Sequence, residues 1–420
     1  MHYPDTYYSR SLAETRDRPV LTGTHRADVA VVGGGFAGLF TALRLARGGA
    51  RVAVLESQSV GFGASGRNGG FVSDGFACGA ALIRRRVGEG HAQALQALSA
   101  EGVEIMRAAI ADLAIAGADP LPGILRLRRF DRAEDLRAQA TPEMPYLDRA
   151  AIRQRVTSAR YLHGLEERTG FHIHPLNTLR GLALGIEALG GAIFEGSAVT
   201  GAELDGATKV LTTAQGRIEA PKVVFATGGY TGPLVPRLRR AMMPIATYVM
   251  MSQAAPDLLA SAIQTRMAIG DDRRASDYYR LVEGGARLLW GGRITTRAAD
   301  TPGITRELRA QMVGTYPQLA PLQIELAWSG LMAYATHRMP QVGQLQPGVW
   351  HCTAFGGHGL NTTAIAGTVT AEAILGASDR IALFAPYGLD WAGGGAGLAV
   401  AQGTYWALRV QDWWRERAAA

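Results

Sequence analysis

The feature that most constrains this chain is a glycine-rich turn set between two short apolar runs. Residues 28–38 read Asp-Val-Ala-Val-Val-Gly-Gly-Gly-Phe-Ala-Gly, and a second run, Arg-Val-Ala-Val-Leu, ends directly before Glu56. The pattern predicts a strand, a turn, a helix and a second strand. In such a unit Gly33 permits the tight turn, Gly35 lets the backbone approach a pyrophosphate, and Gly38 lets the helix pack on the strand.

The same segment indicates how a dinucleotide would be held. The helix N-terminus presents unpaired N–H groups and the positive end of its dipole to the phosphates. Glu56 has the spacing of an acid that accepts hydrogen bonds from a ribose 2′-OH, and its charge would repel a 2′-phosphate. A turn-rich unit that binds nothing is the alternative. The cofactor contacts expected here are Gly33, Gly35, Phe36, Ala37, Gly38 and Glu56.

A second glycine-rich segment favours a flavin over a nicotinamide cofactor. Residues 61–70 contain five glycines together with a hydroxyl, a guanidinium and an amide side chain. A flavin must be held at its pyrophosphate and at its ring, which requires a second backbone segment that approaches closely and carries polar donors. A flexible surface loop is the alternative. The contacts expected from this segment are Gly63, Ala64, Ser65, Arg67, Asn68 and Gly69.

Two later glycine junctions extend the predicted cofactor site. An apolar strand at 222–227 breaks at two glycines, and a strand at 350–355 runs into residues 356–361 and an alanine-rich helix. The second junction provides another helix N-terminus, whose dipole stabilises the negative charge of a reduced flavin. The further contacts expected are Val199, Thr227, Gly228, Gly357, His358, Gly359, Leu360 and Asn361.

Length and composition agree with an ordinary globular chain of two domains. The chain has 420 residues, more than one core requires, with 47% hydrophobic and 19% charged residues. No apolar run approaches the roughly 18–20 residues of a membrane span, and the N-terminus has no signal pattern. Only Cys78 and Cys352 occur, which favours a reducing, cytoplasmic compartment. The net charge of +7 is spread along the chain, so nucleic acid is not an expected partner.

The order of predicted elements indicates an α/β fold: a Rossmann-like FAD-binding domain with an inserted, largely antiparallel substrate domain of α+β type. Residues 1–80, 151–235 and 328–390 are assigned to the first domain, and residues 81–150 and 236–327 to the second. A hairpin is expected around the turn at Gly284 and Gly285. Residues 391–420 form a helix that is expected to pack on the body, with binding to a membrane surface as the alternative.

Several of these segments together resemble a known family. The most specific are residues 61–70, 172–177, 277–281, 338–341 and 357–359. The chain resembles the FAD-dependent oxidoreductases of the D-amino acid oxidase and glycine oxidase superfamily, and within it the γ-glutamylputrescine oxidase-like branch. The resemblance runs from Tyr7 and Tyr8 to the final helix.

The resemblance implies oxidation of a C–N bond, in which hydride passes from the carbon beside a neutral amine to flavin N5. The imine then hydrolyses to a carbonyl compound, and the electrons pass to oxygen or a carrier. Residues 331–336 lack the cysteine, and residues 61–70 the histidine, that some members use for covalent attachment, so FAD is expected to be non-covalent. Asn361 stands where some relatives hold a substrate carboxylate with a lysine, which favours an amine substrate.

The predicted site residues other than cofactor contacts come from the second half of the chain. They are Tyr248, Tyr279, Arg280, Trp328 and His358. Tyrosines on half-buried strands are commonly packing residues, which is the alternative for the first two. An acid such as Asp271 or Asp277 would attract a cationic amine, although acids beside turns are usually solvated. A non-catalytic flavin-binding subunit, an amino acid oxidase or dehydrogenase of the same superfamily, and a nicotinamide-dependent dehydrogenase stay as alternative functions.

Overall fold

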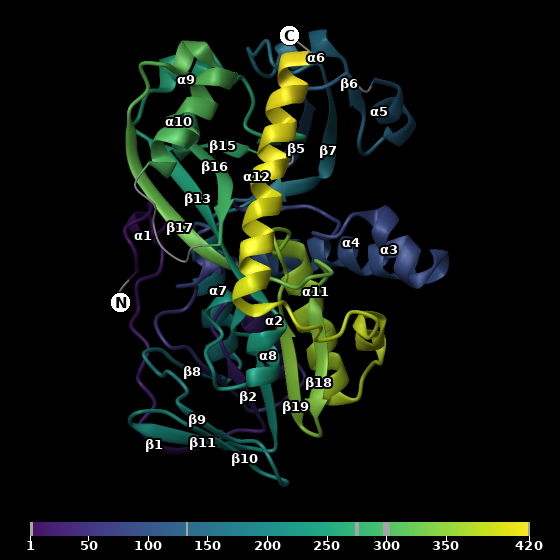
Figure 1. Cartoon of the computed structure of the whole chain (residues 1–420). Coiled ribbons are helices and arrows are strands. Elements are labelled where there is room, and N and C mark those ends of the chain that lie inside the picture. Colours follow the sequence, from purple (N-terminus) through teal and green to yellow (C-terminus); the bar gives the residue numbers. More distant parts are fainter. Residues whose placement is uncertain (1–2, 132, 274–276, 297–302, 419–420) are drawn as a thin grey trace.

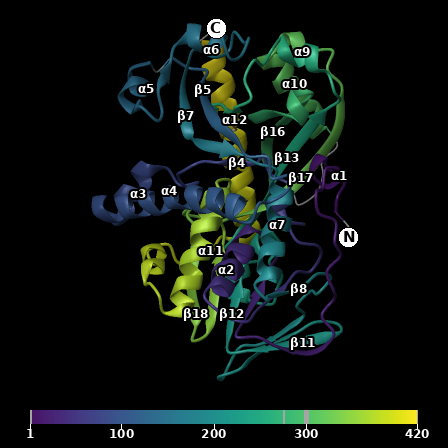
Figure 2. The same ribbon diagram turned by 180° about the vertical axis from the view of Figure 1, so that it is seen from behind.

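The computed structural model describes residues 3–131, 133–273, 277–296 and 303–418 (Figure 1). Within these residues the strands form three sheets, of six, nine and four strands. The six- and nine-stranded sheets lie at opposite ends of the molecule, and helices pack between and around them (Figures 1 and 2). None of the described helices is long and apolar enough to span a bilayer.

The six-stranded sheet forms because the short apolar runs are buried on both faces, as parallel strands require. All four residues of β2 and of β3 are buried, and Val31 of β2 lies between Val54 and Val224 of its neighbours. Five strands run parallel, and the edge strand β18 runs antiparallel to β19. The strand order is β18 (Gln341–Gln346), β19 (Val349–Thr353), β12 (Lys222–Phe225), β2 (Val29–Val32), β3 (Val52–Leu55) and β8 (Ala192–Phe194).

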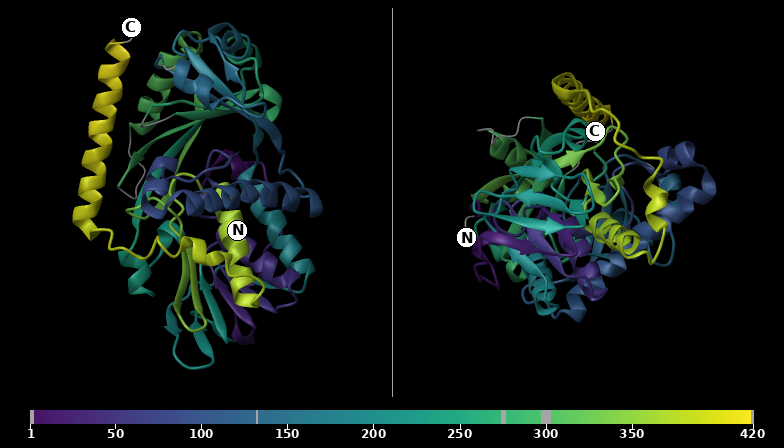
Figure 3. Two further views of the ribbon diagram at one scale, coloured as in Figure 1. Left: turned by 90° about the vertical axis from the view of Figure 1, so that its right-hand side faces the viewer. Right: turned by 90° about the horizontal axis from the view of Figure 1, so that it is seen from below.

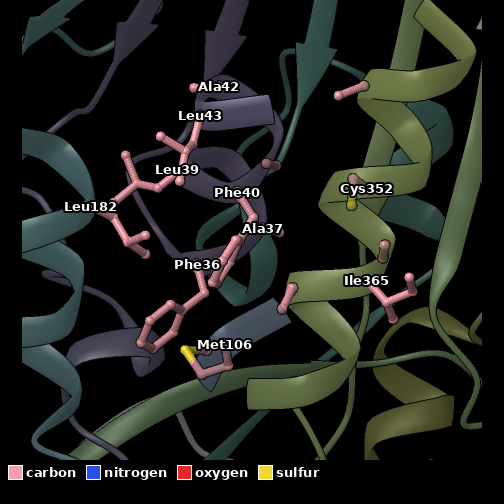
Figure 4. Packing of buried hydrophobic residues seen from close by; sticks show 14 of the residues in the cluster. Phe36, Ala37, Leu39, Phe40, Ala42, Leu43, Met106, Leu182, Cys352 and Ile365 are labelled. Carbon is pink, nitrogen blue, oxygen red and sulfur yellow. The ribbon is translucent and has the colours of Figure 1, made fainter. Parts of the chain in front are cut away.

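Helices α2, α4, α7 and α11 lie with this sheet in the largest hydrophobic cluster (Figure 4). Phe36 and Phe40 of α2, Met106 of α4 and Ile365 of α11 are all buried in it. Helices α4 and α11 approach closely at Gly102, where a Cβ atom would lie 2.3 Å from the carbonyl oxygen of Asn361. The helices are α2 (Phe36–Arg47), α4 (Glu89–Asp112), α7 (Pro175–Ala188) and α11 (Leu360–Leu375).

The nine-stranded sheet is largely antiparallel, and the predicted hairpin is confirmed in it as β15 and β16. One irregularity matters for the site. Thr247 pairs with Ile294 but Tyr248 pairs with Gly292, so Arg293 is an extra residue, and its φ is 61°. The strand order is β17 (Ile324–Tyr334), β13 (Met243–Ser252), β16 (Arg287–Thr295), β15 (Tyr278–Val282), β14 (Ala268–Gly270), β5 (Leu121–Arg128), β7 (His163–His172) and β4 (Phe71–Val72), and β6 (Tyr146–Leu147) pairs with β7.

The four-stranded sheet lies at the lower end of the molecule in Figure 1, away from the nine-stranded sheet. Its order is β1 (Gly23–Arg26), β11 (Gly216–Ala220), β10 (Lys209–Thr212) and β9 (Gly201–Glu203). The remaining α-helices are α1 (Tyr7–Arg10), α3 (Ala80–Val87), α5 (Ala133–Gln139), α6 (Arg149–Arg153), α8 (Pro236–Arg240), α9 (Pro256–Ala260), α10 (Ile304–Thr315) and α12 (Gly394–Ala418). Helix α12 runs along one side of the molecule (Figure 3).

The α/β fold with a largely antiparallel second sheet is confirmed, but the elements are distributed differently from the expected domain ranges. Residues 81–150 are divided: α4 packs with α11 and α2, whereas β5 joins the nine-stranded sheet. Strand β7, expected in the nucleotide-binding half, pairs with β5. An amphipathic helix or an apolar strand specifies a buried face but not the neighbour that covers it, so these ranges could not be read from local pattern.

The close approach of α4 and α11 gives a stability prediction. We expect Gly102→Ala to lower the free energy of unfolding by about 1–3 kcal/mol, because the added methyl meets a backbone carbonyl and one helix must shift. Gly90→Ala in the same helix is the matched control, since its Cβ meets nothing within 4 Å and alanine favours helix. Urea unfolding of both variants checks this; equal free energies of unfolding would contradict it.

Candidate functional site

A cavity of about 1320 Å³ is lined by residues of both large sheets. It exceeds the roughly 300–1,000 Å³ of ordinary small-molecule pockets, so it has room for a dinucleotide together with a substrate. The six-stranded sheet contributes the ends of β2, β3 and β12. The nine-stranded sheet contributes residues of β5, β15, β16 and β17.

The first glycine turn lies at one end of this cavity and leaves no room for side chains. Gly33 has a φ of 114°, and a Cβ there would lie 2.5 Å from the carbonyl oxygen of Ala226. A Cβ at Gly35 would lie 2.9 Å from Ser65 Oγ, which accepts a hydrogen bond from the backbone N–H of Phe36. The backbone is therefore exposed to the cavity at the start of α2, as an approaching pyrophosphate requires.

Glu56 follows β3 and lines the cavity beside this turn. Its carboxylate accepts hydrogen bonds from the backbone N–H of Gly34 at 2.7 Å and of Gln58 at 2.9 Å. Burial raises the pKa of Glu56 even though these N–H groups act in the opposite direction. A half-buried carboxylate at the edge of a nucleotide cavity is suited to accept hydrogen bonds from ribose hydroxyls.

The loop of residues 61–70 is held in shape by its own side chains, which leaves its backbone facing the cavity. Asn68 Nδ2 donates to the carbonyl oxygen of Ser65 at 2.7 Å, and its Oδ1 accepts from the N–H of Gly70 at 2.8 Å. Arg67 donates to the carbonyl oxygen of Phe62 at 2.6 Å. The loop is thus an ordered wall of the cavity, and its polar residues explain that order.

The N-terminus of α11 forms another wall of the cavity. His358 Nε2 lies 3.1 Å from the carbonyl oxygen of Ser73, and burial lowers the pKa of His358, which keeps the ring neutral. Asn361 Nδ2 donates to Ser99 Oγ at 3.0 Å. Asn361 Oδ1 is buried and has no protein partner among the described residues, so it is available to a group bound in the cavity.

Most of the predicted cofactor contacts line the cavity. Ala37 and Gly38 do not: they lie within the first turn of α2, and a Cβ at Gly38 would lie 2.0 Å from the carbonyl oxygen of Gly33. Gly38 lets the helix pack on β2, and Ala37 lies where Gly367 of α11 approaches α2. The residues that the cavity brings together are Gly33, Gly35, Phe36, Glu56, Gly63, Ala64, Ser65, Arg67, Asn68, Gly69, Val199, Thr227, Gly228, Gly357, His358, Gly359, Leu360 and Asn361.

The two tyrosines predicted to contact substrate do not line the cavity. Tyr279 stacks on Trp290 with 4.1 Å between ring centroids and is hydrogen-bonded to the hydroxyl groups of Tyr161 and Tyr316. Tyr248 is buried, and its hydroxyl group lies 2.8 Å from Thr295 Oγ1. These placements correct the expectation for both residues. Their neighbours face the cavity instead, because successive side chains of a strand point to opposite faces.

Arg280 and Trp328 also lie outside the cavity lining, but they support the 61–70 loop from behind. The buried Arg280 guanidinium donates to the carbonyl oxygens of Gly69 and Ile173, each at 2.8 Å. Trp328 Nε1 donates to the carbonyl oxygen of Arg67 at 2.9 Å. Both residues hold the loop in place and lie outside the cavity lining, which differs from the expectation that they contact substrate.

Sequence reasoning missed several residues of the substrate end. Tyr278 and Thr247 line the cavity. Each directly precedes a tyrosine that was predicted to contact substrate, and the alternation of side chains along a strand could have pointed to them instead. Arg293 reaches the cavity only because of the bulge in β16, and Tyr405 only because α12 packs beside it, for which no local signal exists. His172 and His174 form hydrogen bonds within the protein, and the described residues include no cluster of three or more metal-ligating acids, histidines or cysteines.

The six-stranded sheet carries the glycine turn of a dinucleotide-binding site, and the nine-stranded sheet covers the same cavity. Fold and site together are those of a flavin-dependent oxidoreductase. The family model DAO, described as FAD dependent oxidoreductase, matches residues 28–373. The chain is 34% identical to the γ-glutamylputrescine oxidoreductase of Escherichia coli (strain K12) over 394 residues, covering 91% of this chain and 92% of that protein. It is 32% identical to the probable oxidoreductase OrdL of Haemophilus influenzae, covering 90% of each.

Solved structures agree in fold. The glycine oxidase from Geobacillus kaustophilus superposes with a TM-score of 0.72 at 21% identity, covering 87% of this chain and 99% of that chain. The L-proline dehydrogenase from P. horikoshii gives 0.69 at 18% identity, covering 88% and 98%. The chain belongs to the DAO family of FAD-dependent oxidoreductases, and its reaction is the oxidation of a C–N bond. FAD fits the residues present. The backbone at Gly33 and Gly35 carries no side chain that would block a pyrophosphate, the Glu56 carboxylate can accept hydrogen bonds from ribose, and Asn361 Oδ1 has no protein partner among the described residues.

The support of the loop by Arg280 can be tested directly. We expect Arg280→Lys to raise the dissociation constant for FAD about 10-fold or more, because an ammonium cannot reproduce the fork that holds both carbonyl oxygens, and each charged hydrogen bond contributes about 1.5–3 kcal/mol. Arg217→Lys, on the exposed four-stranded sheet, is the control. Fluorescence titration of the apoprotein with FAD measures the constant. Equal constants for the two variants would show that the loop keeps its shape without Arg280.

His172 makes this network sensitive to pH. Its Nδ1 accepts from Arg280 at 3.0 Å, so the proton lies on Nε2, which donates to the carbonyl oxygen of Arg266 at 2.8 Å. Burial, and then the charge of Arg280, lowers the pKa of His172 from 6.5 to about 3.

As the pH falls from 6.5 towards 3, the unfolded chain therefore takes up a proton that the folded chain does not, and stability decreases. We expect His172→Gln to reduce the slope of unfolding free energy against pH at pH 5 by up to about 1.4 kcal/mol per pH unit. Chemical denaturation between pH 4 and 8 measures the slope. An unchanged slope would mean that His172 is already protonated in the native state.

Proposed function

We propose that this enzyme oxidises the C–N bond of an amine whose far end carries a carboxylate, with γ-glutamylputrescine as the model substrate. The single observation that supports this proposal is the group of arginines on the nine-stranded side of the cavity. A γ-glutamyl amide of a diamine combines an oxidisable amine at one end with a free carboxylate at the other. Its length suits a cavity that extends well beyond the cofactor turn.

The arginines reach the cavity for identifiable reasons. Residues 124, 126 and 128 alternate on β5, so Ile124, Arg126 and Arg128 line the cavity while Leu125 and Leu127 enter the core.

The bulge in β16 turns Arg293 towards the same space, as bulges beside active sites commonly do. Arg293 Nε is buried without a hydrogen-bond partner among the described residues, and Glu307 lies 3.4 Å away. We infer that Arg293 donates to the substrate carboxylate.

The acids at this end of the cavity are already engaged. Asp271 accepts from Arg129 at 2.7 Å, and Asp277 is bound by Arg273. Both carboxylates are buried, which differs from the expectation that they are solvated. They are therefore not available to hold a substrate ammonium. Nearby arginines instead lower the pKa of a bound amine, which favours the neutral form that hydride transfer requires.

The flavin supplies the redox chemistry when bound, by accepting a hydride from the carbon beside the amine. The chain's own residues orient the substrate and exclude water. Phe71 and Tyr278 pack edge to face with 5.8 Å between centroids and line the cavity, so they form an apolar wall for the alkyl chain. We propose oxygen or a carrier protein as the electron acceptor and the cytoplasm as the compartment.

The proposal predicts a substrate-dependent effect at Arg293. Under anaerobic conditions we expect γ-glutamylputrescine to bleach the bound flavin far more readily than putrescine, which lacks the carboxylate. Arg293→Gln should raise KM for γ-glutamylputrescine about 10- to 100-fold and leave the reaction with putrescine unchanged, because one charged hydrogen bond is lost. Arg217→Gln is the control. A flavin that stays oxidised with both amines would reject the proposed substrate class, whereas equal effects on both amines would reject only the role of Arg293.

A further inference from the structure

Helix α12 lies beyond residues 28–373, which the family model matches, and its inner face carries polar residues beside the half-buried Leu398, Ala401 and Leu408. Tyr405 is buried and lines the cavity. Gln402 Oε1 accepts from the backbone N–H of Thr296 at 3.0 Å, and Arg409 donates to Glu307 at 3.1 Å. Polar contacts of this kind fasten the helix along the side of the molecule (Figure 3).

The outer face of α12 is apolar, the reverse of an ordinary surface helix. Val400 is 70% exposed, Trp406 59%, Val410 55%, Trp413 46% and Trp414 62%. On an ideal helix these five residues fall within an arc of roughly 140°, opposite the buried Tyr405 and Asp412. An exposed apolar stripe of this kind marks a surface that another body covers.

Positive charge flanks this stripe at both ends. Arg415 and Arg417 are exposed near the C-terminal end, and the Arg417 guanidinium lies 3.8 Å from the ring centroid of Trp413. At the other end, α8 exposes Arg237, Arg239 and Arg240 and is joined to the start of α12 by a hydrogen bond from Ala392 N to Arg240 O.

The acids near α12 are turned away from the stripe or neutralised. Asp412 is buried, and Glu416 lies 3.6 Å from Arg129 on the inner side. Asp390, before the helix, lies 3.9 Å from Arg86. The exposed charged side chains beside the tryptophans are therefore positive.

We propose that the outer face of α12 binds a membrane surface rich in anionic lipid. Tryptophan and arginine beside an apolar stripe are the side chains of a helix that lies in the headgroup region. From these exposed fractions the five side chains of the stripe present roughly 600 Å², which is less than the roughly 800 Å² per partner of a stable protein interface. This area and the basic flanks favour a lipid surface over a second copy of the chain. The proposal does not depend on the identity of the amine.

The experiment uses the full FAD-bound chain and vesicles of phosphatidylcholine with or without phosphatidylglycerol. We expect sedimentation of the protein with the anionic vesicles only, release at high salt because the charges are screened, and a blue shift of tryptophan fluorescence on binding. The triple variant Trp406→Ser, Trp413→Ser and Trp414→Ser should reduce the bound fraction at least 10-fold. Arg415→Gln with Arg417→Gln should reduce it by a smaller factor and weaken its salt dependence.

Leu82→Ser and Leu189→Ser, which are exposed apolar residues on other elements, should bind as the unmodified chain does. Every variant is compared at equal flavin content, and Trp406→Ser alone replaces the triple variant if the latter loses flavin. The proposal is overturned if the unmodified chain stays in the supernatant with anionic vesicles, or if the leucine variants lose binding equally. It is also overturned if light scattering shows a dimer that the tryptophan variant dissociates, because the stripe would then bind a second copy.

Discussion

The buried guanidinium of Arg280 is the interaction on which the cofactor cavity depends. It comes from the nine-stranded sheet and holds the carbonyl oxygen of Gly69 in the 61–70 loop, while His172 and Ile173 anchor its other nitrogens. The loop is rich in glycine so that a flavin can approach its backbone, and a glycine-rich backbone has little rigidity of its own. A charged group that cannot be deprotonated, placed beneath the loop, supplies that rigidity, and it also joins the loop to the second sheet.

The cofactor half could be predicted from the sequence because its signals are local. The turn at Gly33 and Gly35 and the acid at Glu56 are set by the length of one strand, helix and strand, so their spacing alone places them together. The 61–70 loop carries its stabilising amide, Asn68, within its own ten residues. Such features do not require knowledge of which distant strands pair.

The substrate half depends on pairing and register, which the local pattern does not contain. Tyr279 was predicted to face substrate, but it lies in the core and Tyr278 lines the cavity, because neighbouring side chains of a strand point to opposite faces. Arg293 is aimed by a bulge that exists only in the pairing of β13 with β16. Similarly, α4 shows an amphipathic pattern that fits either half of the molecule, and only the close approach at Gly102 explains why it packs on α11.

The final helix shows how the two faces of one element can carry unrelated constraints. Of its inward residues, Gln402 accepts a hydrogen bond from the backbone N–H of Thr296, and Tyr405 is buried beside the cavity. Its outward residues therefore cannot be explained by the core of this chain. Packing on the body, which was the expectation from the sequence, concerns only the inner face of this helix. The tryptophans are instead accounted for by a surface outside the chain, and that surface must tolerate the positive charge beside them.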